Sequence, residues 1–257
     1  MRFPNLPQLE FGLYFADYTG DESMRRVFRY LLATGGEATG AVNTHADTPR
    51  IARFASIYDY PLTECTVDSI REIEELMEST NARVVQVEFR NAIRLIRKSP
   101  EILTQSCISQ ESIANDHHPV AIWLDGSVFF RPPGKTTKSE KKFGKKVYSR
   151  FRKLVLGTNP SYAAMTIESG LKCPTDLRND KKSIAFLDFY VSADFIGRDG
   201  IAMIRDASVG AFHEPLPGGL MTCCSRTFAS QSSISSESAY LLSASVGRCI
   251  ASIAKRK

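Results

Sequence analysis

A short basic segment carries the side chains of this sequence best suited to bind another molecule. Residues 135–153 hold nine Lys and Arg side chains but a single acidic one, Glu140, which gives the segment a charge of +8. The whole chain of 257 residues has a net charge of +5, so the remaining residues together carry −3. Charge concentrated in this way attracts phosphates or acidic protein surfaces over about 8 Å at physiological salt.

We therefore predict a partner-binding patch within this segment. Its residues are Lys135, Lys138, Lys141, Lys142, Lys145, Lys146 and Arg150. An acidic protein surface is one partner that fits these charges. Nucleic acid is another, because Phe143, Tyr148 and Phe151 are interleaved with the cations and aromatic rings stack on bases. Phe151, however, also falls on a predicted apolar helix face, and a solvated linker would show the same lysines.

Catalysis by a metal-dependent nuclease is the alternative to binding. Asp125 and the run Glu140-Lys141-Lys142 follow the D…ExK order of such enzymes. There two carboxylates hold a divalent ion and a lysine lies near the attacking water. In those enzymes the ExK run lies on a strand among apolar residues, whereas here its neighbours are polar, and Asp125-Gly126 is a typical turn pair. The sequence therefore favours a protein that is not an enzyme.

Cysteine and histidine spacing indicates neither a metal site nor a nucleophile. The six cysteines lack the CxxC spacing of zinc sites, and we expect free thiols; they are Cys65, Cys107, Cys173, Cys223, Cys224 and Cys249. His117-His118 has no acidic or thiol side chain at helical ligand spacing, and His213-Glu214 is at most a contact site. No GxSxG or phosphate-binding glycine motif is present. We expect no cofactor and no metal.

Periodicity predicts the elements of the first half of the chain. Alternating apolar residues predict strands over 9–16 and 83–90. Spacings of three and four predict a helix that Asp21 caps and that Gly35-Gly36 ends. A second predicted helix carries Ile70 to Met77, and a short third one covers 91–98. Residues 105–118 are predicted to be a loop.

The second half is predicted to hold a hairpin, a helix, several strands and a final helix. Asp125-Gly126 predicts the turn of a hairpin over 119–130. A Lys-rich loop follows, then a helix whose inner face carries Val147, Phe151, Leu154 and Val155. Strands are predicted over 162–167, 184–191, 201–205, 209–214 and 220–228. A Ser-rich stretch caps a last helix through Leu241 to Ile253.

These patterns together predict an α+β fold in which amphipathic helices pack on a largely antiparallel sheet. We expect one α+β domain over residues 1–257, and a break at 134–145 if the chain forms two lobes. No stretch approaches the ~20 apolar residues of a membrane span. The first residues lack the apolar core of a secretory signal. We therefore expect a cytoplasmic protein that does not contact a membrane.

The last third of the chain resembles a known class of protein in its order of elements. The predicted strand Ile201 to Arg205 leads to the run Glu214-Pro215-Leu216-Pro217-Gly218-Gly219-Leu220-Met221, a strand, a polar stretch and a closing helix. This order is similar to the ends of immunity proteins of bacterial polymorphic toxin systems. The N-terminal strand and helix, Phe11 to Leu32, fit as well.

The resemblance implies a cytoplasmic protein that neutralises a toxin by direct binding, with no catalytic residues to carry over. Immunity proteins against nucleases are often acidic, because they mimic nucleic acid. The basic segment departs from that pattern. Under this interpretation either the toxin presents an acidic surface to the basic patch, or the acidic remainder of the chain makes the contact. Nucleic-acid binding through the patch is the competing hypothesis.

Overall fold

A computed structural model gives the fold of this chain. It describes residues 8–46, 63–78, 82–91, 93, 101–105, 119–125, 129, 138–167, 170–179 and 185–253. Its strands are β1 (Gln8–Tyr14), β2 (Glu37–Ala46), β3 (Thr63–Thr66), β4 (Ala82–Arg90), β5 (Glu101–Gln105), β6 (Val120–Asp125), β7 (Tyr162–Ile167), β8 (Asp188–Ser192), β9 (Phe212–Leu216) and β10 (Gly219–Cys223). Its helices are α1 (Gly20–Ala33), α2 (Ile70–Glu78), α3 (Lys138–Thr158), α4 (Pro174–Asn179), α5 (Ala193–Ala207) and α6 (Ser236–Ile253).

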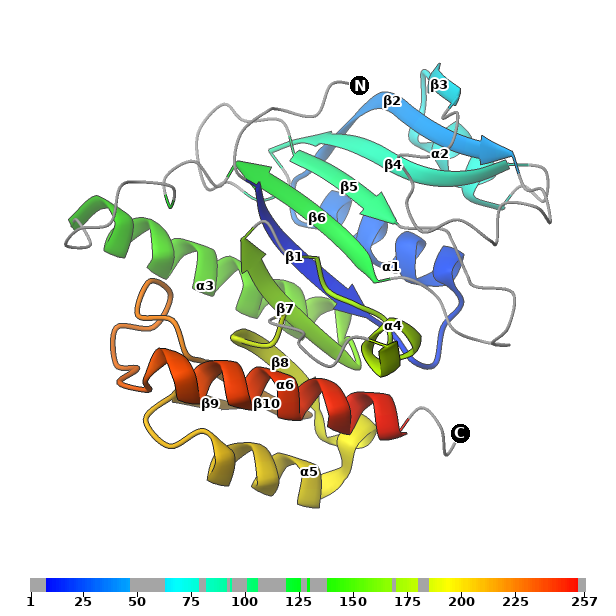
Figure 1. The fold of residues 1–257 in the computed structure, drawn as a ribbon. Helices are drawn as coiled ribbons and strands as arrows, with labels where there is room; N and C mark the ends of the chain where they lie inside the picture. The colour runs from blue at the N-terminus through cyan, green and yellow to red at the C-terminus, as the bar shows by residue number, and fades with distance from the viewer. Residues whose placement is uncertain are drawn as a thin grey trace.

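One ten-stranded sheet forms the middle layer of the molecule, with helices on both sides (Figure 1). The strand order is β3-β2-β4-β5-β6-β1-β7-β8-β10-β9, and every pairing is antiparallel. The predicted α+β class with a largely antiparallel sheet is therefore confirmed. β1 pairs with β6 on one side and β7 on the other, so the sheet joins strands from before and after 134–145. On this ground we retain one domain over 1–257 as our proposal.

The first face of the sheet is covered by α1, α2 and α3, and we call it face one. Leu9, Phe11 and Leu13 alternate along β1 toward this face and are fully buried. The inner sides of the three helices complete one apolar core, with Phe28 of α1 and Phe151 of α3 among its largest members. Burying an aromatic side chain of this kind stabilises a fold by about 1.5–3 kcal/mol.

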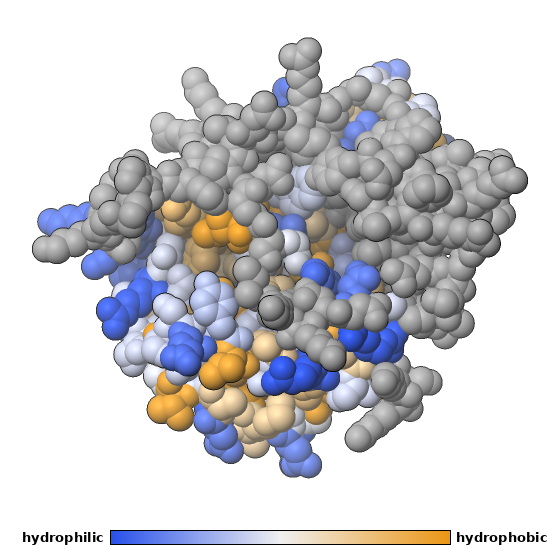
Figure 2. Space-filling model, in the orientation of Figure 1, coloured by the Kyte–Doolittle hydropathy of each residue, from blue (hydrophilic) through white to orange (hydrophobic). Residues whose placement is uncertain are grey.

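The opposite face, face two, is covered by α4, α5 and α6 over β7, β8 and β10. Figure 1 shows these helices in front of the sheet and α1 and α3 behind it. A second apolar core lies under them and includes Tyr162, Phe186, Phe189 and Ile250. Figure 2 shows that the outer surface over α5 and α6 mixes hydrophilic and hydrophobic residues. Among the described residues, no helix is long and apolar enough to cross a membrane.

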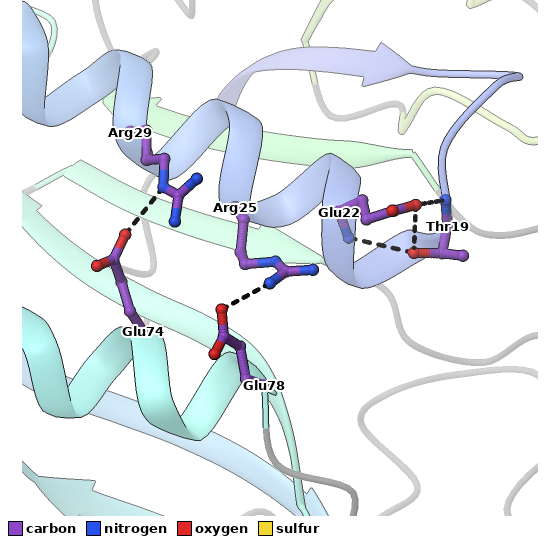
Figure 3. A network of polar contacts seen from close by, with 6 residues as sticks. All are labelled: Thr19, Glu22, Arg25, Arg29, Glu74 and Glu78. Carbon is purple, nitrogen blue, oxygen red and sulfur yellow. Dashed lines mark hydrogen bonds and ion pairs between the residues drawn. The ribbon is translucent and has the colours of Figure 1, made fainter.

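Helix α1 begins with a capping box at Thr19 rather than at the predicted cap Asp21. The Thr19 hydroxyl accepts from the Glu22 N–H at 3.3 Å, and the Glu22 carboxylate accepts from the Thr19 N–H at 2.8 Å. Two otherwise unpaired donors of the first turn are thereby satisfied. Ion pairs from α1 to α2 then fix the two helices side by side (Figure 3); they are Arg25–Glu78 and Arg29–Glu74, both at 2.9 Å.

Two sequence predictions about strands disagree with the described residues. Of the hairpin predicted over 119–130, the structure describes 119–125 and Phe129: the edges of β6 pair with β1 and β5, Phe129 is not in a strand, and 126–128 and 130 lie outside the described residues. The segment Ile201–Arg205 belongs to α5 rather than to a strand. Ser192 caps the first turn of α5, the helix is kinked at Gly197 (φ 76°, ψ 167°), and in its second part Ile204 is buried while Met203 is 42% exposed. A five-residue apolar run does not distinguish a strand from a buried helix turn.

Other predictions differ in extent. The Lys-rich segment, predicted to be a loop, is helical from Lys138 onward. Strand β5 was not predicted, and its last residue, Gln105, is where the predicted loop over 105–118 begins. The polar segment 172–182 contains α4, and strand β8 begins only at Asp188. The predicted helix over 91–98 lies outside the described residues except for Asn91 and Ile93. The strand at 201–205 was one element of the resemblance to immunity proteins, whereas the Pro217–Gly219 turn and the closing helix are present.

Candidate functional site

The candidate site is the outer side of helix α3, which we call the α3 basic face. Six of the seven predicted patch residues lie on this helix and are exposed; they are Lys138, Lys141, Lys142, Lys145, Lys146 and Arg150. The seventh, Lys135, lies outside the described residues. Helical spacing therefore arranges the charges along one rigid element rather than a solvated linker.

The inner side of α3 explains why the cations all face outward. Phe143, Val147, Phe151 and Val155 are buried in the core of face one, and the Phe151 ring lies 5.2 Å from that of Phe11. An amphipathic helix whose apolar side is buried in this way presents its polar side to solvent. Phe143 and Phe151 are consequently unavailable for stacking on bases.

Two glycines bring α3 unusually close to its neighbours. A Cβ at Gly144 would lie 1.9 Å from the Thr227 carbonyl oxygen, and one at Gly157 would lie 2.1 Å from the Tyr30 ring. Glycine in a helix interior costs about 1 kcal/mol relative to alanine. Here that cost is offset by close backbone packing, which holds the helix in a fixed position.

A polar anchor ties the middle of α3 to the edge strand β9. Arg152 Nε donates to Glu214 Oε1 at 2.6 Å, and the Tyr148 hydroxyl donates to Glu214 Oε2. Burial is the main cause that raises the pKa of Tyr148, and the hydrogen bond to Glu214 adds to it. Glu214 therefore does structural work that the sequence did not indicate. Glu214 forms an ion pair with Arg152, whereas the six cations of the α3 basic face are exposed to solvent.

The nuclease alternative does not fit this geometry. Glu140 and Lys142 both lie in the first turns of α3. Residues i and i+2 point to the same side of a strand but are about 200° apart around a helix. A carboxylate and a lysine at this spacing therefore cannot converge on one metal-bound water. No group of three metal-ligating side chains occurs among the residues that the structure describes.

A serine and a histidine do meet in space, but as a structural pair. Ser208 Oγ lies 3.1 Å from His213 Nε2, and Thr222 Oγ1 lies 3.1 Å from His213 Nδ1. The Ser208 hydroxyl is fully buried and donates to the Ile204 carbonyl. It is therefore not presented to a substrate. Burial is the main cause that lowers the pKa of His213, and the ring joins the end of α5 to strands β9 and β10.

The five described cysteines form no disulfide bond; they are Cys65, Cys173, Cys223, Cys224 and Cys249. Burial raises the pKa of Cys223 well above its usual range, and Asp188 adds to the effect. A protonated, fully buried thiol is a poor nucleophile. Cys107 and His117-His118 lie outside the described residues.

The sequence did not indicate the roles of two carboxyl groups within the sheet, Asp188, which is buried, and Glu10, which is partly buried. Burial raises the pKa of each to about 7. Asp188 accepts from the Ser225 N–H at 3.0 Å, which fixes the chain where it leaves β10. Glu10 lies on face two, away from α3. An acidic residue in the middle of an otherwise apolar strand was the sequence signal for both.

These features define the class of protein as an α+β protein with a rigid basic helical face. No protein-family model matches the sequence, and no curated protein matches it. A solved structure, that of Pseudomonas aeruginosa T6SS protein PA0821, is similar with a TM-score of 0.45 and 10% identity over 95% of this chain and 73% of that one. At that level the similarity supports no argument about what this chain does.

Proposed function

We propose that this chain is a cytoplasmic binding protein of the immunity type, which neutralises a protein partner by occluding it. The α3 basic face supplies the contact surface, and the partner presents an acidic surface to it. The observation that carries the proposal is the arrangement of six exposed cations on one helix whose opposite side is packed into the core.

The rigidity of α3 favours a preformed docking surface. Binding a partner costs free energy when side chains or backbone must be ordered at the interface. The backbone of α3 is already fixed by Gly144, Gly157 and the Glu214 anchor, so that part of the cost is met on folding. Like charges spaced along one face also steer an acidic partner toward it and speed association.

Nucleic acid is the competing partner for the same surface. Stacking of bases on aromatic side chains gives nucleic-acid binding little support, because Phe143 and Phe151 are buried and the Tyr148 hydroxyl is hydrogen-bonded to Glu214. What remains is phosphate attraction, which is independent of base sequence. The geometry thus favours a protein partner over a base-reading role, and the experiment below distinguishes the two.

Affinity capture from the native host with the full chain as bait identifies the partner, and co-expression then tests neutralisation. We expect the captured partner to arrest growth when it is expressed alone and to be harmless when it is expressed with this chain. Replacing Lys138, Lys141, Lys142 and Lys145 together by Glu is expected to weaken binding at least 100-fold and to abolish protection.

The matched control reverses charge on the other side of the sheet. Arg198→Glu with Arg205→Glu changes two exposed cations of α5 and is expected to leave binding and protection unchanged. Full protection by the four-fold α3 variant would show that the contact lies elsewhere. Salt-sensitive binding of DNA or RNA that the α3 variant loses, with no protein partner captured, would replace the proposal by nucleic-acid binding.

A further inference from the structure

Buried polar atoms without partners lie on face two, at the neighbouring strands β2 and β4 and, further along the sheet, at β7. Among the described residues, the buried side-chain atoms that make no hydrogen bond are Asn43 Oδ1, Gln86 Nε2 and Thr166 Oγ1. The strand registers place all three on the side of the sheet opposite the core of α1, α2 and α3. A buried polar atom left unpaired loses its hydrogen bond to water without gaining another, which destabilises the fold. Such atoms therefore mark places where a ligand can supply the missing partner.

One of these atoms lies next to a carboxyl group. Glu10 of β1 is directly opposite Thr166 of β7 on one side and Trp123 of β6 on the other. Directly opposed residues have Cβ atoms about 4.5–5.5 Å apart. Thr166 is 6% exposed and its hydroxyl oxygen is buried, whereas Glu10 and Trp123 are partly exposed, so a ligand would approach along the side chains of Glu10 and Trp123.

The hydrogen bonds of Glu10 leave half of its acceptor capacity unused. Trp123 Nε1 donates to Glu10 Oε2 at 3.1 Å, and the Leu171 N–H donates to Glu10 Oε1 at 3.1 Å. A carboxylate has about four acceptor positions, so one remains on each oxygen. Among the described residues, Glu10 has no cationic partner. A Cβ at Gly170 would lie only 3.6 Å from Glu10 Oε2, so glycine keeps the approach to that oxygen open.

We propose that Glu10 and Thr166 form a binding site for a guanidinium group, with Trp123 and the Leu171 N–H holding the carboxylate in place. A guanidinium group has parallel N–H donors that match the two oxygens of a carboxylate, and it has further donors for a neighbouring oxygen. The ligand supplies a cationic partner for the Glu10 carboxylate and a hydrogen-bond donor for Thr166 Oγ1. The site lies on the face opposite α3, so it does not rest on the proposed function.

Trp123 makes the site measurable, since it is the single tryptophan of the chain and its indole N–H contacts Glu10. The full chain is titrated at pH 8 with n-butylguanidinium while Trp123 fluorescence is followed. We expect a saturable change, and no change with the neutral analogue n-butylurea. The blocked peptide acetyl-Gly-Arg-Gly-amide distinguishes the sources: tighter binding of the peptide assigns the group to an arginine of a protein, and tighter binding of the small compound assigns it to a free metabolite.

Two variants test the named side chains. Thr166→Val removes a hydroxyl that makes no hydrogen bond to any described residue, so the variant should fold normally, and we expect binding at least tenfold weaker. Glu10→Gln removes the charge and is expected to abolish binding. Glu88→Gln is the matched control, because Glu88 lies on the same face and accepts from the Thr39 hydroxyl at 3.0 Å; it should bind as the unmodified chain does. Equal responses to n-butylurea, or unchanged binding by Thr166→Val, would overturn the proposal.

Discussion

The two faces of the sheet are built on different principles. Face one is largely apolar and is covered by α1, α2 and α3 in a single core, with Asp188 and Glu214 as polar exceptions. Face two has an apolar core under α4, α5 and α6, but over β2, β4 and β1 it carries polar side chains such as Gln86, Glu88 and Glu10. Apolar burial is expected to supply stability, and unpaired polar atoms are expected to mark binding. The difference separates the parts of the molecule that hold the fold from those that contact other molecules.

Removing a core ring should have the largest effect. Phe151→Ala removes a fully buried side chain between α3 and the sheet and is expected to lower the free energy of unfolding by about 3–5 kcal/mol. Phe186→Ala does the same in the core of face two and should cost a similar amount. Urea denaturation measures both, with Leu241→Ala, 65% exposed, as a control within about 0.5 kcal/mol. A near-neutral Phe186→Ala would mean that face two adds little to stability.

The buried carboxyl groups predict that stability falls as the pH rises. Burial raises the pKa of Asp188 from 3.8 to about 7 and that of Glu10 from 4.5 to about 7. Between these values the folded chain holds protons that the unfolded chain has released. The free energy of unfolding therefore decreases from about pH 4 to pH 7 and levels off above it, by up to a few kcal/mol.

Urea denaturation at pH 4.5 and 7.5 measures the decrease in the free energy of unfolding, and two variants assign it to the two faces. Asp188→Asn removes the contribution from face one, and Glu10→Gln removes the one from face two. A guanidinium ligand should cancel the contribution of Glu10 alone, because it favours the ionised carboxylate. A difference between the two pH values that neither variant changes would contradict both assignments.

Replacing a helical glycine by alanine should change stability in opposite directions on the two faces. At Gly144 of α3 the added Cβ would lie 1.9 Å from a backbone oxygen, and Gly144→Ala is expected to destabilise the fold by about 1–3 kcal/mol. At Gly247 of α6 the nearest atom would be 3.5 Å away, so Gly247→Ala should stabilise by up to about 1 kcal/mol. Thermal unfolding compares the pair. A neutral Gly144→Ala would show that α3 is free to move away from Thr227.

The smallest effect is expected from the ion pairs between α1 and α2. Arg29–Glu74 joins a largely exposed guanidinium to a carboxylate that is one-third exposed. A double-mutant cycle with Arg29→Ala and Glu74→Ala should give a coupling free energy of about 0.2–1 kcal/mol that decreases in high salt. A coupling above 2 kcal/mol would mean that α2 depends on this pair rather than on its buried residues Ile73 and Met77.

The parts of the candidate site differ in how far the sequence predicted them. The buried stripe at Val147 and Phe151 follows from one helical period and agrees with the structure, whereas the first cations were predicted to lie in a loop and are helical from Lys138 onward. The anchor from Arg152 to Glu214 joins residues 62 positions apart, and no local pattern indicates it. Glu10 meets Trp123 across 113 positions for the same reason.

The sequence by itself determined α1, α2, α3 and α6, because helical hydrogen bonds and amphipathic spacing are local and can be read within one window. It also determined the alternation of β1 and the concentration of charge in one segment. The tertiary structure alone decided which strands pair, that β6 pairs with β1 and β5, that Ile201–Arg205 is helical, and which polar groups face one another across the sheet. Strand pairing joins residues that are distant in the chain, so its outcome depends on the competition among all strands at once.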